Sequence, residues 1–374
     1  SRVLVLGHNT TLEAGQSAYW GQAILFVNDN PNAPQAADFK DDRSVSDIVA
    51  QWSAFQNDRS AQQIHEDALA DFESWRKNTA PTQLTEKEKK LWRQSETVLR
   101  MGQIREAIQS NRNNLGMLLA ALPIGEWHTG WVRDALYAVA GFAMTGHTEE
   151  SQLAMDFFLG SDSGRYAAAS QLKQPYRISV CRYFGNGIEE ADWNNEGPNI
   201  ETDGWGLVLW GARLHLHYSC DLDWLDSTTR RGDTVFEALH QIAKDIEFHI
   251  KANLPGPDAS IWEVHWNLRQ VFGYTAAAQI RGLLDFADIA EVHGEADIAD
   301  HFRGLGQAML DTSKKALVYQ PLQSFASHLG VAGQDVHVDG STAEFFSWFL
   351  VEPEDPIFLG TMTQYSRLIT GFGG

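Results

Sequence analysis

Residues 89–317 alternate between segments that are apolar on every side and segments that have one polar face. The apolar segments are 131–146 beyond its first four residues, 203–217 and 274–294, and the amphipathic ones are 89–108, 149–159, 233–254 and 295–317. A helix that is apolar all round is buried, whereas an amphipathic helix faces water on one side. The alternation predicts a mainly α fold in which an inner and an outer ring of helices pair antiparallel. A helical solenoid is the competing interpretation, but its repeats would recur at a fixed period, and the sequence shows none.

The first part of the chain has a different pattern. Residues 2–28 contain two runs rich in apolar, β-branched and aromatic residues, VLVL and SAYWGQAILFV, which predict strands. Two or three strands are not stable alone, so we expect them to pair with further strands or with the helical body. Residues 31–84 predict a helical linker, because apolar side chains recur there at helical spacing. A capping box of Thr85 and Glu88 then marks the start of the helical domain, which we assign to residues 85–374.

Charge and composition exclude several classes of partner. The chain has 49 acidic and 29 basic residues and a net charge of −20, which repels nucleic acid and anionic membrane surfaces. No apolar run is long enough to span a membrane and no signal peptide is visible at the start, so we predict a soluble protein. Cys181 and Cys220 are too few for a disulfide framework or a four-thiolate site, and the histidines lack ligand spacing. We therefore predict no metal and no organic cofactor.

Charged residues fall at the starts of the predicted inner helices. Arg133 and Asp134 begin one helix, Asp203 begins the next, and Asp339 precedes STAEFFSWFLV. An acid in the first turn is the usual helix cap, and this is our interpretation of Asp339. A cation is unfavourable there, so Arg133 with Asp134 indicates a preorganised polar clamp. If the inner helices run in one direction, these residues meet at one end of the ring.

A carboxylate in ASIWEVHWNLRQ, Glu263, lies beside Trp262 and close to Trp266. A carboxylate near large apolar rings needs a partner, a raised pKa or a function. Its loop precedes the inner helix predicted at 274–293, which brings Glu263 to the same end of the ring. A carboxyl group with a raised pKa can protonate a glycosidic oxygen, and the 13 tryptophans suit the stacking of sugar rings. A buried ion pair with Arg269 or Arg281 is the alternative that the residues leave open.

Three stretches resemble consecutive signature blocks of the glucoamylase-like family, glycoside hydrolase family fifteen, in its bacterial type. They are GEWHTGWVRDALYAVAGFAMTGHTEES, NIETDGWGLVLWGARL and SIWEVHWNLRQVFGYTAAAQIRGLLDFADIAE, and they occur in the family's order. The resemblance covers about residues 86–352, and the combination of W-x-R-D with a downstream I-W-E is its most specific part.

The resemblance implies an (α/α)6 barrel that removes glucose, with inversion, from the non-reducing ends of α-linked gluco-oligosaccharides or polysaccharides. It places Glu263 at the general acid. The implied substrate-binding residues are Trp131, Arg133, Asp134, Asp203, Trp262 and Arg281, and we add Trp266, which stands where many relatives have a small residue. Residues 1–30 resemble the last strands of the β-sandwich that precedes the barrel in bacterial members.

The general base is the missing part of this assignment. Inversion needs a second carboxylate across the sugar, roughly 6.5–9.5 Å from the acid. In the family this base lies on a late barrel loop, which we expect beyond LITGFGG, so that the chain is a fragment of a longer enzyme. The alternatives are a relocated base at Glu344 or Asp339, a non-catalytic carbohydrate-binding or regulatory barrel, and a trehalase on the same fold.

Overall fold

The computed structural model divides the chain into two compact units, Ser1–Thr82 and Gln83–Gly374. It describes residues 10–20, 44–76, 82–108, 113–122, 127–168, 172, 175–193, 195, 197–264, 268–331 and 338–371. Residues 10–20 contain no strand, and the rest of the strands predicted within 2–28 lies outside the described residues.

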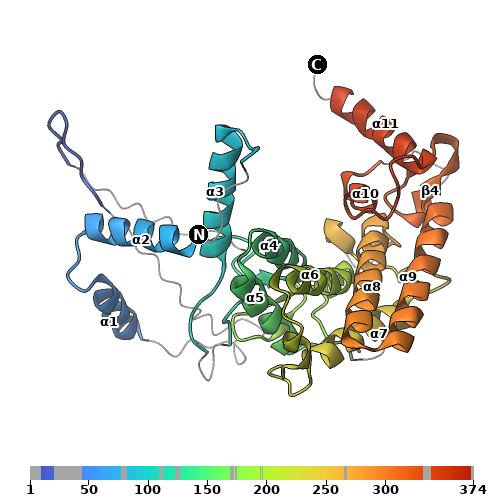
Figure 1. Ribbon diagram of the computed structural model, residues 1–374, viewed down its shortest axis with the longest axis horizontal. Helices are drawn as coiled ribbons and strands as arrows, with labels where there is room; N and C mark the ends of the chain where they lie inside the picture. Colours follow the sequence, from blue (N-terminus) through green and yellow to red (C-terminus); the bar gives the residue numbers. More distant parts are fainter. Residues whose placement is uncertain are drawn as a thin grey trace. The chain divides into compact units, whose positions relative to one another are not determined.

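The described part of the first unit contains two helices, α1 (Val45–Gln56) and α2 (Ala61–Trp75) (Figure 1). Each begins with a capping box: the serine before the helix accepts a hydrogen bond from a backbone N–H of the first turn, and the side chain at that position bonds back to the serine N–H. These reciprocal bonds satisfy donors that a helix start leaves unpaired.

The second unit is mainly helical, as the sequence predicts, and the helices predicted as inner and as outer alternate along the chain. The burial contrast is not uniform, because the predicted outer helix Thr148–Gly160 and the predicted inner helix Val132–Met144 have eight buried residues each. The inner helices are α4 (Val132–Met144), α6 (Asp203–Ser219) and α8 (Gly273–His293), and the outer ones are α3 (Glu86–Gly102), α5 (Thr148–Gly160), α7 (Val235–His249) and α9 (Ala296–Ala316). α6 packs against both α4 and α8, and α9 packs against α8 (Figure 1). Within the described ranges, no helix combines the length and the apolarity needed to span a membrane.

Short elements complete this unit. The helical ones are η1 (Asp223–Asp226), η2 (Ser260–Trp262), η4 (Gln320–Leu322), η5 (Leu329–Val331), η6 (Gly340–Ala343), α10 (Glu344–Ser347) and α11 (Pro356–Gly371). The strands are β1 (Gly130–Trp131), β2 (Arg182–Tyr183) and β3 (Glu189–Glu190), which form one antiparallel sheet, and the antiparallel pair β4 (Val318–Tyr319) and β5 (Ser324–Phe325). The register of the first sheet sets Arg182 between Trp131 and Glu190.

Two glycines allow the backbones of α6 and α8 to approach each other. A Cβ atom at Gly206 would collide with the backbone of Ala278, and one at Gly282 would collide with the backbone of Gly206. We expect Gly206→Ala to lower the free energy of unfolding by about 1–3 kcal/mol, because extra atoms in a packed core force the backbone apart. Denaturant unfolding followed by tryptophan fluorescence measures this change.

Gly304→Ala in α9 is the matched control, because nothing lies within 4 Å of an added Cβ there. Alanine is the better helix former, so this variant is expected to gain about 0.5–1 kcal/mol. Equal stability of Gly206→Ala and the unmodified protein would show that the close approach is not required.

Candidate active site

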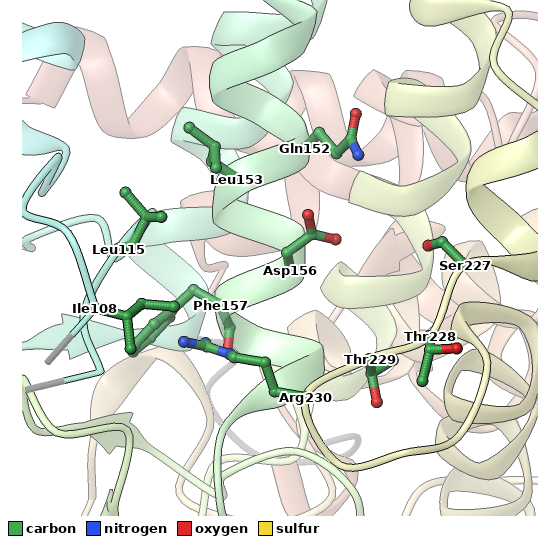
Figure 2. Close-up of a pocket in the computed structure, with 10 residues that line it drawn as sticks. All are labelled: Ile108, Leu115, Gln152, Leu153, Asp156, Phe157, Ser227, Thr228, Thr229 and Arg230. Atoms are coloured by element: carbon green, nitrogen blue, oxygen red, sulfur yellow. The ribbon is translucent and has the colours of Figure 1, made fainter. Parts of the chain in front are cut away.

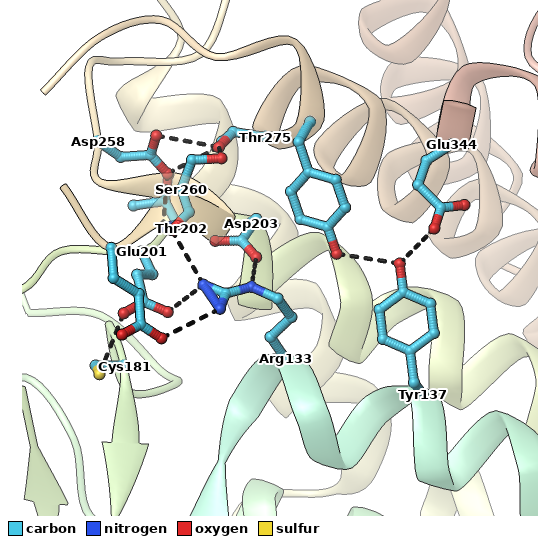
Figure 3. Close-up of polar contacts among 12 residues, drawn as sticks. Arg133, Tyr137, Cys181, Glu201, Thr202, Asp203, Asp258, Ser260, Thr275 and Glu344 are labelled. Carbon is cyan, nitrogen blue, oxygen red and sulfur yellow. Dashed lines mark hydrogen bonds and ion pairs between the residues drawn. The ribbon is translucent and has the colours of Figure 1, made fainter. Parts of the chain in front are cut away.

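The side chain of Arg133 connects the start of α4 to the start of α6 and to the loop before α8 (Figure 3). Its Nε donates to Asp203 Oδ2 at 2.9 Å, and its Nη2 donates to Glu201 and, at 3.1 Å, to the carbonyl oxygen of Ser260. Its Nη1 lies 3.6 Å from Oε1 of Glu263. The starts of the inner helices therefore meet at one end, and Arg133, Asp203 and Glu263 come together there as the sequence predicts.

Burial makes this cluster electrostatically strong. Arg133, Glu201 and Asp203 are all buried. Burial opposes the charge of Arg133, but Asp203 and Glu201 outweigh it and raise the pKa of the guanidinium. Burial also raises the pKa of Glu201 well above its usual range, although Arg133 acts against the rise. In a buried ion pair, the removal of one partner leaves the other charge buried and uncompensated. The guanidinium of Arg133 is therefore held against Asp203 and Glu201.

Glu201 is a site residue that the sequence did not indicate. Besides the bond from Arg133, it accepts one from Asn199 Nδ2 at 2.6 Å. It also accepts a hydrogen bond from the thiol of Cys181 at 3.3 Å (Figure 3). It precedes α6 by two residues. Asn199 lies two positions before it, whereas Arg133 and Cys181 come from other segments. Only its spacing from Asp203 could have drawn attention to it.

Glu263 is more accessible than the buried acids Glu201 and Asp203. It follows η2 in a left-handed conformation, with φ of 48°, and its side chain is 42% exposed. Partial burial raises its pKa, Arg133 opposes this rise, and Asp192 and Asp134 add to it. The result is an accessible carboxyl group that keeps its proton to a higher pH than an ordinary glutamate, which is the property a general acid needs.

Asp258 supports the segment that carries Glu263, and the sequence did not indicate it either. It is fully buried, and burial raises its pKa to about 7. It accepts a hydrogen bond from the backbone N–H of Thr202 at 3.0 Å, and Thr275 Oγ1 lies 3.0 Å from both its carboxyl oxygens and 3.0 Å from Ser260 Oγ. These contacts join the loop to the starts of α6 and α8 (Figure 3).

The indole of Trp262 is held beside this site by Asp339. Trp262 Nε1 donates to Asp339 Oδ2 at 2.6 Å, while the residue stays 55% exposed. Asp339 also accepts from the backbone N–H of Ser341 at 2.9 Å and caps η6, which confirms the predicted cap. A cavity of about 580 Å³ opens beside Trp262, with Gln270 and His328 among its lining residues. Trp262 therefore offers an oriented, accessible aromatic surface.

Trp131 has a different environment from Trp262. It is only 4% exposed, and the guanidinium of Arg182 lies 4.2 Å from the centre of its ring. One face of this indole is thus covered by a cation rather than open to a ligand.

The other predicted residues are placed as follows. Asp134 follows Arg133 and is an exposed residue. The neighbouring protein nevertheless desolvates its carboxyl group in part, which raises its pKa. Arg281 lies two turns along α8, where its Nε donates to Asp285 at 2.8 Å, and it does not join the Arg133 cluster. Trp266 lies outside the described residues.

Two tyrosine hydroxyl groups, one from α4 and one from α8, lead to a carboxylate at the start of α10. Tyr137 OH lies 3.1 Å from Tyr274 OH and donates to Glu344 Oε1 at 2.8 Å (Figure 3). Glu344 thus begins α10 within the same polar region, and its carboxylate is held by Tyr137.

A second cavity, of about 350 Å³, lies between α5 and the segment 227–230 (Figure 2). Its charged residues have partners within the protein: Asp156 accepts from Trp224 Nε1 at 3.0 Å, and Arg230 donates to the carbonyl oxygen of Phe157 at 3.3 Å. We assign no function to this cavity.

Comparisons with known proteins give consistent results. The sequence model of glycosyl hydrolases family 15 matches residues 93–370, whereas no curated protein sequence matches the chain. A wild-type glycosidase structure has a TM-score of 0.54 at 20% identity, over 74% of this chain and 69% of that chain. A bacterial glucoamylase complexed with acarbose has a TM-score of 0.52 at 15% identity, over 73% of this chain and 39% of that chain. At these identities the two structures establish a shared, mainly helical fold.

Proposed function

The chain belongs to glycosyl hydrolases family 15, and from this membership and the geometry of the site we propose that it releases glucose from the non-reducing ends of α-glucans or short α-gluco-oligosaccharides with inversion. That it is a glycoside hydrolase follows from the family. The exo-acting cleavage, the α-glucosidic substrate and the inversion are parts of the proposal.

The observation that supports this proposal best is the environment of Glu263. Its carboxyl group is accessible, its pKa is raised by partial burial, and Arg133 lies 3.6 Å away. In the proposed reaction, Glu263 donates its proton to the glycosidic oxygen as the bond to the terminal sugar breaks. The proton loss leaves a carboxylate, which the nearby guanidinium of Arg133 stabilises.

The other residues have proposed roles in binding. Arg133, Asp134 and Asp203 contact the hydroxyl groups of the terminal glucose, and Trp262 forms an apolar wall against the carbon–hydrogen face of the sugar. Trp131, Trp266 and Arg281 complete the proposed subsite. Because Arg133 is already bonded to Asp203 and Glu201, it enters the reaction preorganised rather than adjusting to the sugar.

The proposal also covers the finer architecture. We propose that the helices form a ring of the (α/α)6 type and that residues 1–30 are the last strands of a β-sandwich. Inversion needs a second carboxylate, at roughly 6.5–9.5 Å from the acid, to activate water on the opposite face of the sugar. We assign no residue to that base.

Proton NMR of the chain with maltose, isomaltose, trehalose and a short dextran tests the proposed reaction. We expect β-glucose to appear before mutarotation, because inversion of an α-linkage gives the β-anomer. The substrate that reacts identifies the linkage, and reaction with trehalose alone would instead identify a trehalase. Initial α-glucose would contradict inversion, and sugar binding without any glucose would indicate a non-catalytic barrel.

A further inference from the structure

Asp339 uses its two carboxyl oxygens for two different contacts. Oδ1 accepts a hydrogen bond from the backbone N–H of Ser341 at 2.9 Å, which is the cap of η6. Oδ2 accepts one from the indole Nε1 of Trp262 at 2.6 Å. A helix cap needs a single side-chain acceptor, so capping accounts for the first contact but not for the second.

The backbone of Asp339 is held by η6 and α11. Its carbonyl oxygen lies 2.8 Å from Thr342 Oγ1 in η6 and 2.9 Å from the hydroxyl group of Tyr365 in α11. Asp339 itself is only 9% exposed. An ionised acceptor that is fixed by its backbone and shielded from water holds its donor in one orientation.

Trp262 stays open although its N–H is bonded. The residue is 55% exposed, and it borders the cavity of about 580 Å³, a volume within the range of small-molecule sites. An indole that stabilised the fold by packing would be covered by its neighbours. An indole that is tied at its polar tip and open over much of its apolar surface is suited to contact with a ligand.

The segment that carries this indole is also fixed at its backbone. Glu263 follows Trp262 directly, and its backbone N–H donates to the carbonyl oxygen of Ser260 at 3.1 Å. The same carbonyl oxygen accepts from Arg133 Nη2 at 3.1 Å. The contact with Asp339 adds the restraint that the backbone bonds do not supply, which is the orientation of the ring.

We propose that Asp339 is a positioning residue, which holds the ring of Trp262 in the orientation in which a sugar stacks against it. This inference rests on the proposed function, in which Trp262 forms the apolar wall of the sugar site. Asp339 acts through the indole, because a ring that is already ordered does not have to be immobilised when the sugar binds. Its carboxylate therefore sets the affinity for sugar rather than the protonation of the glycosidic oxygen.

Asp339→Asn separates the two contacts of the carboxylate. The amide oxygen can still accept from Ser341, whereas the amide nitrogen then faces the indole N–H, and two donors form no hydrogen bond. The Kd of maltose is measured by isothermal titration calorimetry in the Glu263→Gln background, where turnover does not interfere. We expect this Kd to rise about three- to tenfold, the effect of having to order one side chain on binding.

Two further variants show whether the effect passes through the indole. Trp262→Phe keeps an aromatic face but removes the donor, so adding Asp339→Asn to it should change the Kd no further. Thr342→Val is the structural control, because it removes a hydroxyl group from the same turn and leaves the carboxylate of Asp339 in place. Its Kd should equal that of the parent. An equal rise in Thr342→Val, or an effect of Asp339→Asn that persists in full in Trp262→Phe, would overturn the positioning role.

Nitrogen-15 NMR of the indole groups gives a readout that needs neither turnover nor sugar. The Trp262 signal is identified by its absence in Trp262→Phe. A hydrogen bond to a carboxylate moves an N–H proton downfield, so the signal should move upfield in Asp339→Asn and stay in place in Thr342→Val. An unmoved signal in Asp339→Asn would overturn the proposal. A moved signal together with a raised Kd, in a chain that cleaves no glucoside, would retain the positioning role and reject the proposed hydrolysis.

Discussion

Replacement of Glu263 by glutamine is expected to lower kcat on maltose by about 10²–10⁴-fold, the usual contribution of a positioned proton donor. Glutamine preserves the size and most of the hydrogen bonding of the side chain but has no proton to give to the glycosidic oxygen. In the proposed reaction Glu263 supplies that proton, and partial burial, which raises its pKa, helps it to remain protonated. Steady-state kinetics at a pH where the unmodified protein is most active measures the loss.

The nature of the leaving group provides the control for this variant. Fluoride departs with little need for protonation, so hydrolysis of α-glucosyl fluoride should be affected much less than hydrolysis of maltose. Binding of maltose, measured by tryptophan fluorescence, should persist. An equal loss on both substrates would point to a damaged site, and unchanged turnover of maltose would show that Glu263 is not the acid.

Replacement of Arg133 by glutamine is expected to lower the free energy of unfolding by about 3–5 kcal/mol, the cost of removing one partner from a buried ion pair. Glu201 and Asp203 would keep their buried positions without the guanidinium that donates to both. Denaturant unfolding measures the change, and calorimetry of the thermal transition provides a second readout.

A compensated variant shows whether the effect is electrostatic. If unpaired carboxylates cause the loss, then Glu201→Gln and Asp203→Asn, added to Arg133→Gln, should restore most of the stability. The same triple variant should remain inactive, since the proposed sugar-binding groups are gone. A loss below about 1 kcal/mol for Arg133→Gln alone, the range of an exposed pair, would contradict the buried-pair interpretation.

The helical architecture was largely predictable because its signal is local. Each helix carries its own pattern of apolar and polar positions, and burial follows from that pattern. Thr85 and Asp339 likewise signal their helix starts within a few residues, and both act as caps in the structure. The partner of Asp339, Trp262, was not predictable, because it comes from 77 positions away.

The site was predictable only in part. Arg133, Asp203 and Glu263 could be placed together because each lies at or before the start of an inner helix. Glu201 also lies just before an inner helix, but nothing local to it shows that this acid is buried and bonded to Arg133 and Cys181. Arg182 reaches Trp131 through strands of two residues each, which are too short to show the alternation that marks a strand.

Arg281 shows how a local signal can be overlooked. Its partner, Asp285, lies four residues later on the same helix face, a spacing at which opposite charges commonly pair. The ion pair with Asp285 was therefore an alternative that the sequence itself showed. A role of Arg281 in sugar binding stays a prediction.

The bonds of Arg133 also bear on how the protein acquires its activity. The guanidinium bonds to partners that are 68, 70 and 127 positions away in the sequence. Contacts of such high sequence separation require large loops to close, which makes their formation slow compared with the helices themselves. We therefore expect the Arg133 cluster to form only after the helices that carry its partners have associated, so that a newly made chain is rich in helix before its proposed sugar site is assembled.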